Sequence, residues 1–149
     1  DVCFPPDVEC AIGAVNGSGD GVVFIDGSIP HPTLGPIREP IRVEFRGSKI
    51  VDISGGQEAE ALKQLLADAN DPEHAYFMGE IGLGMNPACS LNGRMLEDEG
   101  CAGTIHFGIG DDRSFGGNNI CAQHIDLIFK APTIRVDGRL IMQDGKVVD

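Results

Sequence analysis

Three short segments of the chain each carry acidic or imidazole side chains inside an otherwise apolar run. These residues are Glu80 in FMGEIGLG, His106 in GTIHFGIG, and His124 with Asp126 in QHIDLIF. Alternate residues of a β-strand share a face, so the apolar residues of each run would point one way and the polar residues the other. Charged groups are almost never buried unpaired. The pattern therefore indicates either a metal site or a buried hydrogen-bonded network, and we favour the metal.

His124 and Asp126 form the sharpest local pattern. Residues two apart in a strand lie about 7 Å apart on one face, close enough for an imidazole and a carboxylate to bind one metal ion or two adjacent ions. Asp126 could instead orient a nearby polar group. Glu80 is a further candidate ligand, because an ionised carboxylate in an apolar run needs a cation or hydrogen-bond donors nearby. Glu9, in PPDVECAIG, is a weaker candidate of the same kind.

A polar stretch, GIGDDRSFGGNN, lies between His106 and His124. Long loops that join ligand-bearing strands often carry substrate contacts, so we expect this loop to border the site. We interpret Asp111 and Asp112 individually as surface residues of the loop. The other two histidines stand in proline-rich or turn-like sequence and are interpreted as ordinary surface residues.

The elements that must position these residues indicate an α+β fold, with a β-rich mixed sheet and one main helix. Leucines at helical spacing predict this helix at about 57–69, ended by Asn70-Asp71-Pro72. A second, shorter helix is predicted within 93–99. The remaining predicted elements are strands and tight turns: a strand over 21–29, a hairpin around Gly47-Ser48, and a C-terminal β-meander with turns at Asp137-Gly138 and Asp144-Gly145.

The chain has 149 residues and a formal net charge of −12. We expect residues 1–149 to form one metal-site domain, the C-terminal part of a longer two-domain protein, since the chain opens on Asp1 rather than methionine. Nucleic acids and anionic membranes require a basic surface, so the charge argues against both as partners. Five widely spaced cysteines without a CxxC pair are interpreted as reduced thiols of a cytoplasmic protein.

Two longer stretches carry a resemblance to a known family. They are GEIGLGMNPACSLNGRMLEDEGCAGTIHFGIGDDRSFGGNNICAQHIDLIF and the ending PTxxVDGxLIMxDG. They resemble the C-terminal half of the aminopeptidase T/aminopeptidase S family of metallopeptidases, whose wider superfamily also contains proteins similar to 2,5-dihydroxypyridine 5,6-dioxygenase, an Fe(II) ring-cleaving enzyme. The resemblance implies a two-metal centre, whose ligands would fall on Glu9, Glu80, His106, His124 and Asp126. The tyrosine of that centre has no counterpart, because Arg113, Ser114 and Phe115 stand near its expected place.

Two mechanisms fit this ligand set. With two metal ions, the site would activate water against an amide carbonyl, as a hydrolase that uses Zn²⁺, Co²⁺ or Mn²⁺ and has Glu9 or Glu80 as ligand or base. With one ion held by His106, His124 and Asp126, it would be a 2-His-1-carboxylate site that leaves positions open for O₂ and substrate on Fe(II). The missing tyrosine argues against the hydrolase, whereas the two retained glutamates favour a two-metal site.

We expect an aminopeptidase-type hydrolase, with an Fe(II) ring-cleaving dioxygenase as the alternative and a non-catalytic binding homologue as the third reading. The expected partner is a small-molecule or peptide substrate, with no nucleic acid and no membrane, and a homodimer is left open. Because each candidate ligand stands on the polar face of its own strand, we expect the side chains of Glu80, His106, His124 and Asp126 to surround one cavity.

Overall fold

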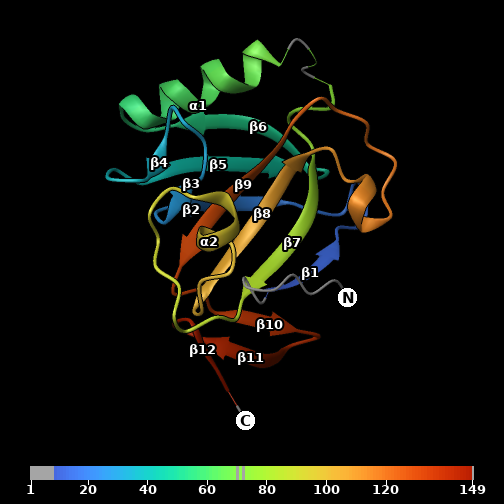
Figure 1. The fold of residues 1–149 in the computed structure, drawn as a ribbon. Coiled ribbons are helices and arrows are strands. Elements are labelled where there is room, and N and C mark those ends of the chain that lie inside the picture. Colours follow the sequence, from blue (N-terminus) through green and yellow to red (C-terminus); the bar gives the residue numbers. More distant parts are fainter. Residues whose placement is uncertain (1–8, 70, 72, 149) are drawn as a thin grey trace.

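A six-stranded sheet is the largest unit of the chain, as seen in a computed structural model that describes residues 9–69, 71 and 73–148 (Figure 1). In the order in which they lie side by side, its strands are β1 (Glu9–Gly13), β7 (Met78–Gly84), β8 (Thr104–Gly110), β9 (His124–Lys130), β3 (Ser28–Ile29) and β4 (Gly35–Pro36). The pairings β1–β7, β7–β8 and β8–β9 are antiparallel. The three segments with candidate ligands are therefore adjacent strands.

The face of this sheet that points away from the candidate ligands is apolar and forms one side of the core. Ile109, Leu127 and Phe129 are buried on it. A second sheet covers these residues and consists, in order, of β2 (Gly21–Ile25), β5 (Ile41–Arg46) and β6 (Lys49–Ser54). Val43 and Phe45 of β5 belong to the same buried cluster. The apolar half of each alternating strand is thus used for packing, which leaves the polar half free for a site.

The main helix closes this core. It was predicted over 57–69, and α1 spans Gln57–Asp68 with Ala69 as its C-cap. Figure 1 shows α1 lying along β6, and its Leu62 and Leu66 are buried in the core cluster. Part of its predicted stop signal, Asn70 and Pro72, lies outside the described residues. No helix within the described ranges is long and apolar enough to cross a membrane.

The predicted α+β class, rich in β-strands, is confirmed, and so are the hairpin and the meander. Gly47 and Ser48 join β5 to β6 with φ of 55° and 63°. At the lower end of Figure 1 the meander forms a separate three-stranded sheet. Its strands are β10 (Ile134–Val136), β11 (Arg139–Gln143) and β12 (Lys146–Val147). Two short helical elements lie elsewhere in the chain: α2 (Met95–Asp98) and the 3-10 turn η1 (Arg113–Phe115).

The prediction of a single strand over 21–29 is wrong. The segment is divided between the two sheets, since β2 pairs with β5 while Ser28 of β3 lies opposite Ile128 of β9. The chain crosses at Gly27, where a Cβ atom would lie 2.6 Å from the carbonyl oxygen of Ile128. The apolar pattern continues through this crossing, so it cannot reveal that the pairing partner changes.

Gly138→Val should destabilise the C-terminal meander, because Gly138 has a φ of 81° and β-branched residues resist positive φ. No neighbouring atom of the described chain lies within 4 Å of the position that a Cβ would take, so the cost is conformational. We expect a loss of about 1–2 kcal/mol in the free energy of unfolding, measured by urea denaturation. Gly138→Asn should lose much less, because asparagine tolerates this conformation. Equal losses in both variants would contradict the turn assignment.

Candidate metal centre

The register of the three central strands brings the predicted ligands to one face of the sheet. Glu80 of β7 lies opposite Gly108 of β8, which in turn lies opposite Asp126 of β9. Opposite residues of paired strands share a face, so the two carboxylates stand on either side of a glycine. His106 and His124 are each two positions from a member of this row and share the same face.

Glu80 lies at the centre of the cluster. Its Oε2 atom is 2.9 Å from Nε2 of His124, and its Oε1 atom is 3.4 Å from Nε2 of His106. Glu9 of β1 approaches the same His106 nitrogen to 3.6 Å, and Oδ1 of Asp126 is 3.2 Å from Nε2 of His124. All five predicted residues are therefore brought together.

These five residues form two groups that could each hold a metal ion. One group is Glu9, Glu80 and His106, and the other is Glu80, His124 and Asp126. Within each group the ligand atoms lie within 4.8 Å of one another. Imidazole nitrogens and carboxylate oxygens are ordinary ligands of iron, zinc and manganese. Because Glu80 belongs to both groups, the geometry suits one ion in either group or two ions bridged by this carboxylate.

Glycines leave the space that the ligands occupy. A Cβ atom at Gly108 would lie 2.5 Å from Oε2 of Glu80 and 2.6 Å from Cε1 of His124. A Cβ atom at Gly82 would overlap the imidazole ring of His106. Any larger residue at either position would displace a ligand. The glycines inside β7 and β8, which weaken a strand in general, are thus required by the site.

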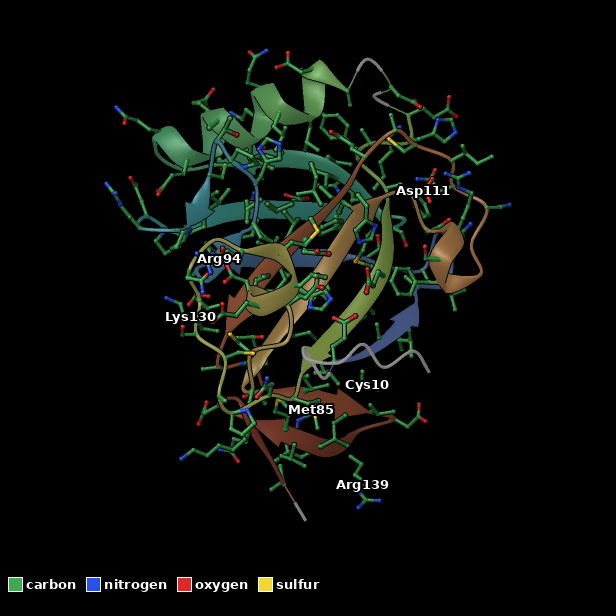
Figure 2. The ribbon with its side chains drawn as sticks, in the orientation of Figure 1. Cys10, Met85, Arg94, Asp111, Lys130 and Arg139 are labelled. Carbon is green, nitrogen blue, oxygen red and sulfur yellow. The ribbon has the colours of Figure 1, made fainter. Side chains whose placement is uncertain are left out.

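Two contacts fix the ring of His124. Its Nδ1 atom donates a hydrogen bond to the backbone carbonyl of Asp111 at 2.7 Å, and the ring of Phe115 stacks on it with centroids 5.9 Å apart. Such a carbonyl contact orients a metal-binding histidine and directs its other nitrogen toward the ion. Both partners come from the loop after β8, where Figure 2 labels Asp111. This loop therefore lies against the candidate ligands.

The same loop is anchored by Asp112, which we predicted to lie at the surface. That prediction is wrong, because the residue is only 1% exposed. Its carboxylate accepts a hydrogen bond from the backbone amide of Asn119 at 2.7 Å. Gly79 and Gly117 pack directly against its side chain. In the sequence, such an aspartate looks like any polar loop residue, since its partner is a backbone group seven positions later.

The electrostatics of the cluster favour a bound cation. Burial lowers the pKa of His124, but its hydrogen bonds to Asp126 and Glu80 outweigh burial and raise the pKa to about 11. The pKa of His106 is likewise raised, against its burial, by Glu80 and the surrounding carboxylates. Burial would raise the pKa of Asp126, yet the contact with His124 holds it below its usual value. The carboxylates thus need positive charge, which imidazole protons or a divalent metal ion can supply.

Glu99 is a site residue that the sequence analysis missed. It follows α2, lines the same cavity and hydrogen-bonds Asp126. Burial, and next the charge of Asp126, raise the pKa of Glu99 to about 9, so the carboxyl group is protonated at neutral pH and donates to Asp126. The run MLEDEG resembles a solvated acidic surface. Only the return of the chain over the sheet brings this residue to the cluster.

A cavity of about 310 Å³ opens beside the cluster. Six members of its lining are titratable, namely Glu9, Glu80, Glu99, Asp111, His124 and Asp126. Apolar side chains from α2 and from the loop after β8 complete the walls, namely Met95, Leu96 and Phe115. His106 is 1% exposed and is not part of the lining, so the expectation that it surrounds the cavity with Glu80, His124 and Asp126 is wrong for this residue. The cavity therefore has an acidic floor and apolar walls.

The family model for 2,5-dihydroxypyridine 5,6-dioxygenase matches residues 6–149. The chain belongs to this family. The 2,5-dihydroxypyridine 5,6-dioxygenase of Pseudomonas putida (strain KT2440) is 30% identical over an alignment of 141 residues that covers 88% of this chain and 40% of the relative. A solved structure of the dioxygenase from Pseudomonas putida KT2440 is similar, with a TM-score of 0.77 and 25% identity over 89% of this chain and 41% of that one. The chain thus spans about two fifths of these relatives.

Membership of the dioxygenase family overturns two expectations. The assignment to the aminopeptidase T/aminopeptidase S family is wrong, and so is the aminopeptidase-type hydrolase, because the family model and both relatives are dioxygenases. The comparisons favour the alternative expectation, an Fe(II) ring-cleaving dioxygenase. The error has a physical cause: imidazoles and carboxylates hold divalent ions in both kinds of enzyme, so the ligand types alone cannot separate them. The absence of the family tyrosine, which argued against a hydrolase, agrees with this result.

Gly108→Ala should weaken metal binding, because the added methyl group would displace Glu80 and His124. We expect the dissociation constant for Mn²⁺ or Zn²⁺, measured by isothermal titration calorimetry, to rise roughly tenfold or more. Gly138→Ala is the matched control, since it adds the same methyl group at a strained turn of the meander, away from the cluster. A Gly108→Ala protein that binds metal as tightly as this control would contradict the geometry described above.

Proposed function

We propose that this chain forms the metal-binding part of a non-haem iron dioxygenase that opens the ring of a dihydroxypyridine. The observation that carries the proposal is that a dioxygenase family model runs through every strand that supplies a candidate ligand. The Pseudomonas putida relative is named for acting on 2,5-dihydroxypyridine at the bond between C5 and C6. The expected reaction inserts both atoms of O₂ across that ring bond.

We further propose that iron is held by Glu80, His124 and Asp126. This group lines the cavity, so an ion there would be reachable by a substrate. The donor set, one imidazole and two carboxylates, suits Fe(II), and three protein ligands leave coordination positions open. Bound iron supplies the one-electron chemistry that allows O₂ to react with an aromatic ring.

In this proposal His106 does not bind the iron but positions Glu80, one of its ligands. It lies on the far side of Glu80 from His124 and contacts both Glu80 and Glu9. By holding the Oε1 atom of Glu80, it would direct the Oε2 atom toward the ion and balance the charge of the buried carboxylates. A second ion between Glu9, Glu80 and His106 is the competing arrangement.

The cavity walls suit a flat aromatic substrate. Phe115 is stacked on His124 with an angle of 30° between the rings, so it offers a ring face beside the proposed iron. Met95 and Leu96 provide apolar contact on the α2 side and would keep water from the reacting ring. The carboxyl group of Glu99 can hydrogen-bond a ring hydroxyl or the ring nitrogen.

Oxygen uptake by the full-length, Fe²⁺-loaded protein tests the proposed reaction. With 2,5-dihydroxypyridine we expect one O₂ consumed per substrate and the loss of the ultraviolet absorption of the aromatic ring. His124→Ala should reduce the rate by at least about a hundredfold, because it removes a proposed ligand. His31→Ala is the control, since His31 contacts Thr33 in a separate loop. Release of aniline from a leucyl-anilide without oxygen uptake would contradict the proposal.

Metal analysis separates the one-ion and two-ion arrangements. We expect one iron per chain in the full-length protein, lost in His124→Ala and retained with weaker affinity, by roughly tenfold, in His106→Ala. Mass spectrometry of the native holoprotein would count the ions directly. Two irons per chain, or equal loss of iron in both variants, would show that His106 is itself a ligand.

A further inference from the structure

The segment between β7 and β8 folds back on itself and is closed at its base by backbone contacts. Asn86 forms an isolated parallel β-bridge with Cys101, and its amide donates to the carbonyl of Gly100 at 2.8 Å. The carbonyl of Asn86 accepts hydrogen bonds from the amides of Ala102, at 3.0 Å, and Cys89, at 3.4 Å. The turn from Asn86 therefore brings Cys89 back toward Cys101.

The two thiols lie beside each other at this base. Both cysteines carry thiols, with Cys101 buried and Cys89 half-buried. Burial, and next the charge of the neighbouring Cys89 thiol, raise the pKa of Cys101 to about 11. The Cys101 thiol also donates to the carbonyl of Glu97 at 3.4 Å. Cys89 is thus the more accessible of two adjacent thiols and the one that a soluble oxidant would meet first.

The loop that these cysteines close carries one wall of the cavity. Met95, Leu96 and Glu99 all lie between them in the chain and all line the cavity beside His124. Asp98 fixes the inside of the loop, because its buried carboxylate accepts hydrogen bonds from the amides of Asn92 and Gly93. A link between the ends of the loop would therefore restrain the cavity wall.

We propose that Cys89 and Cys101 form a reversible disulfide that fastens this wall over the candidate metal centre. The oxidant is a low-molecular-weight disulfide such as glutathione disulfide. The Cys89 thiolate attacks one of its sulfurs, its S–S bond breaks, and a glutathione thiolate leaves and takes up a proton. The Cys101 thiolate then attacks the Cys89 sulfur of the mixed disulfide and releases the second glutathione. Two protein thiols are oxidised, and one glutathione disulfide is reduced to two glutathione molecules.

The positions of Lys63, Arg94 and Arg113 make this disulfide easy to detect. Trypsin cleaves after these residues and yields the peptides 64–94 and 95–113, each with a single cysteine. The full-length metal-loaded protein would be equilibrated with glutathione disulfide, alkylated, denatured and digested without reductant. We expect most chains to yield the two peptides joined as one species, which separates after reduction. Titration against mixtures of reduced and oxidised glutathione would give the reduction potential.

Three variants serve as controls. Cys89→Ser and Cys101→Ala should abolish the joined species, whereas Cys10→Ser, which removes an exposed cysteine on β1, should leave it unchanged. Glutathione attached to Cys89 without the joined peptides, or Cys89 joined to a different cysteine, would overturn the proposal. So would the recovery of both thiols unmodified.

Hydrogen exchange tests the effect on the cavity wall. After oxidation, amides between residues 90 and 100 should exchange more slowly, by roughly tenfold, while those of α1 stay unchanged. Unchanged exchange in the loop would refute the fastening of the wall even if the disulfide forms. None of these measurements depends on catalytic activity, so they remain decisive if the proposed dioxygenase reaction is absent.

Discussion

The concentration of negative charge around Glu80 is the constraint on which the rest of the structure depends. Four carboxyl groups and two imidazoles share a small region in which Glu80 and Asp126 are almost fully buried. Such a group of acids is unstable unless protons or a metal ion balance it. Imidazoles on both sides of Glu80 and a neutral carboxyl group at Glu99 reduce the repulsion between these acids. A site of this kind is built to take up a cation.

A paired sheet is well suited to hold that charge. The strands β7 and β8 have hydrogen-bonded neighbours on both sides, so the backbone under the ligands cannot relax away from the repulsion. Gly82 and Gly108 leave room above the sheet for the side chains of the cluster. Nε2 of His124 lies 2.9 Å from Glu80 and 3.2 Å from Asp126. On the opposite face, the apolar residues of the same strands anchor the site to the core. Packing and chemistry thus use alternate residues of one element.

Strand alternation was enough to predict the floor of the site and the fold class. The apolar residues that alternate with His106 and Asp126 show which face of the strand each polar side chain occupies. The pairing of neighbouring strands then brings these side chains together. Glu99 and Asp112 could not be found in this way, because contacts across loops decide whether an acid is buried or exposed. The change of sheet at Gly27 could not be predicted for a related reason, because the apolar pattern does not indicate which strand pairs with which. The reaction class was mispredicted because ligand types are shared between hydrolases and dioxygenases.

The division of the cavity between floor and walls has a consequence for how such sites diverge. The candidate ligands stand on strands, whereas Met95, Leu96 and Phe115 come from two connecting segments that tolerate substitution and changes of length more readily. Selection can therefore reshape what enters the cavity without displacing the candidate ligands. Related chains could keep the same group of imidazoles and carboxylates and acquire different organic substrates through changes in α2 and in the loop that contains η1.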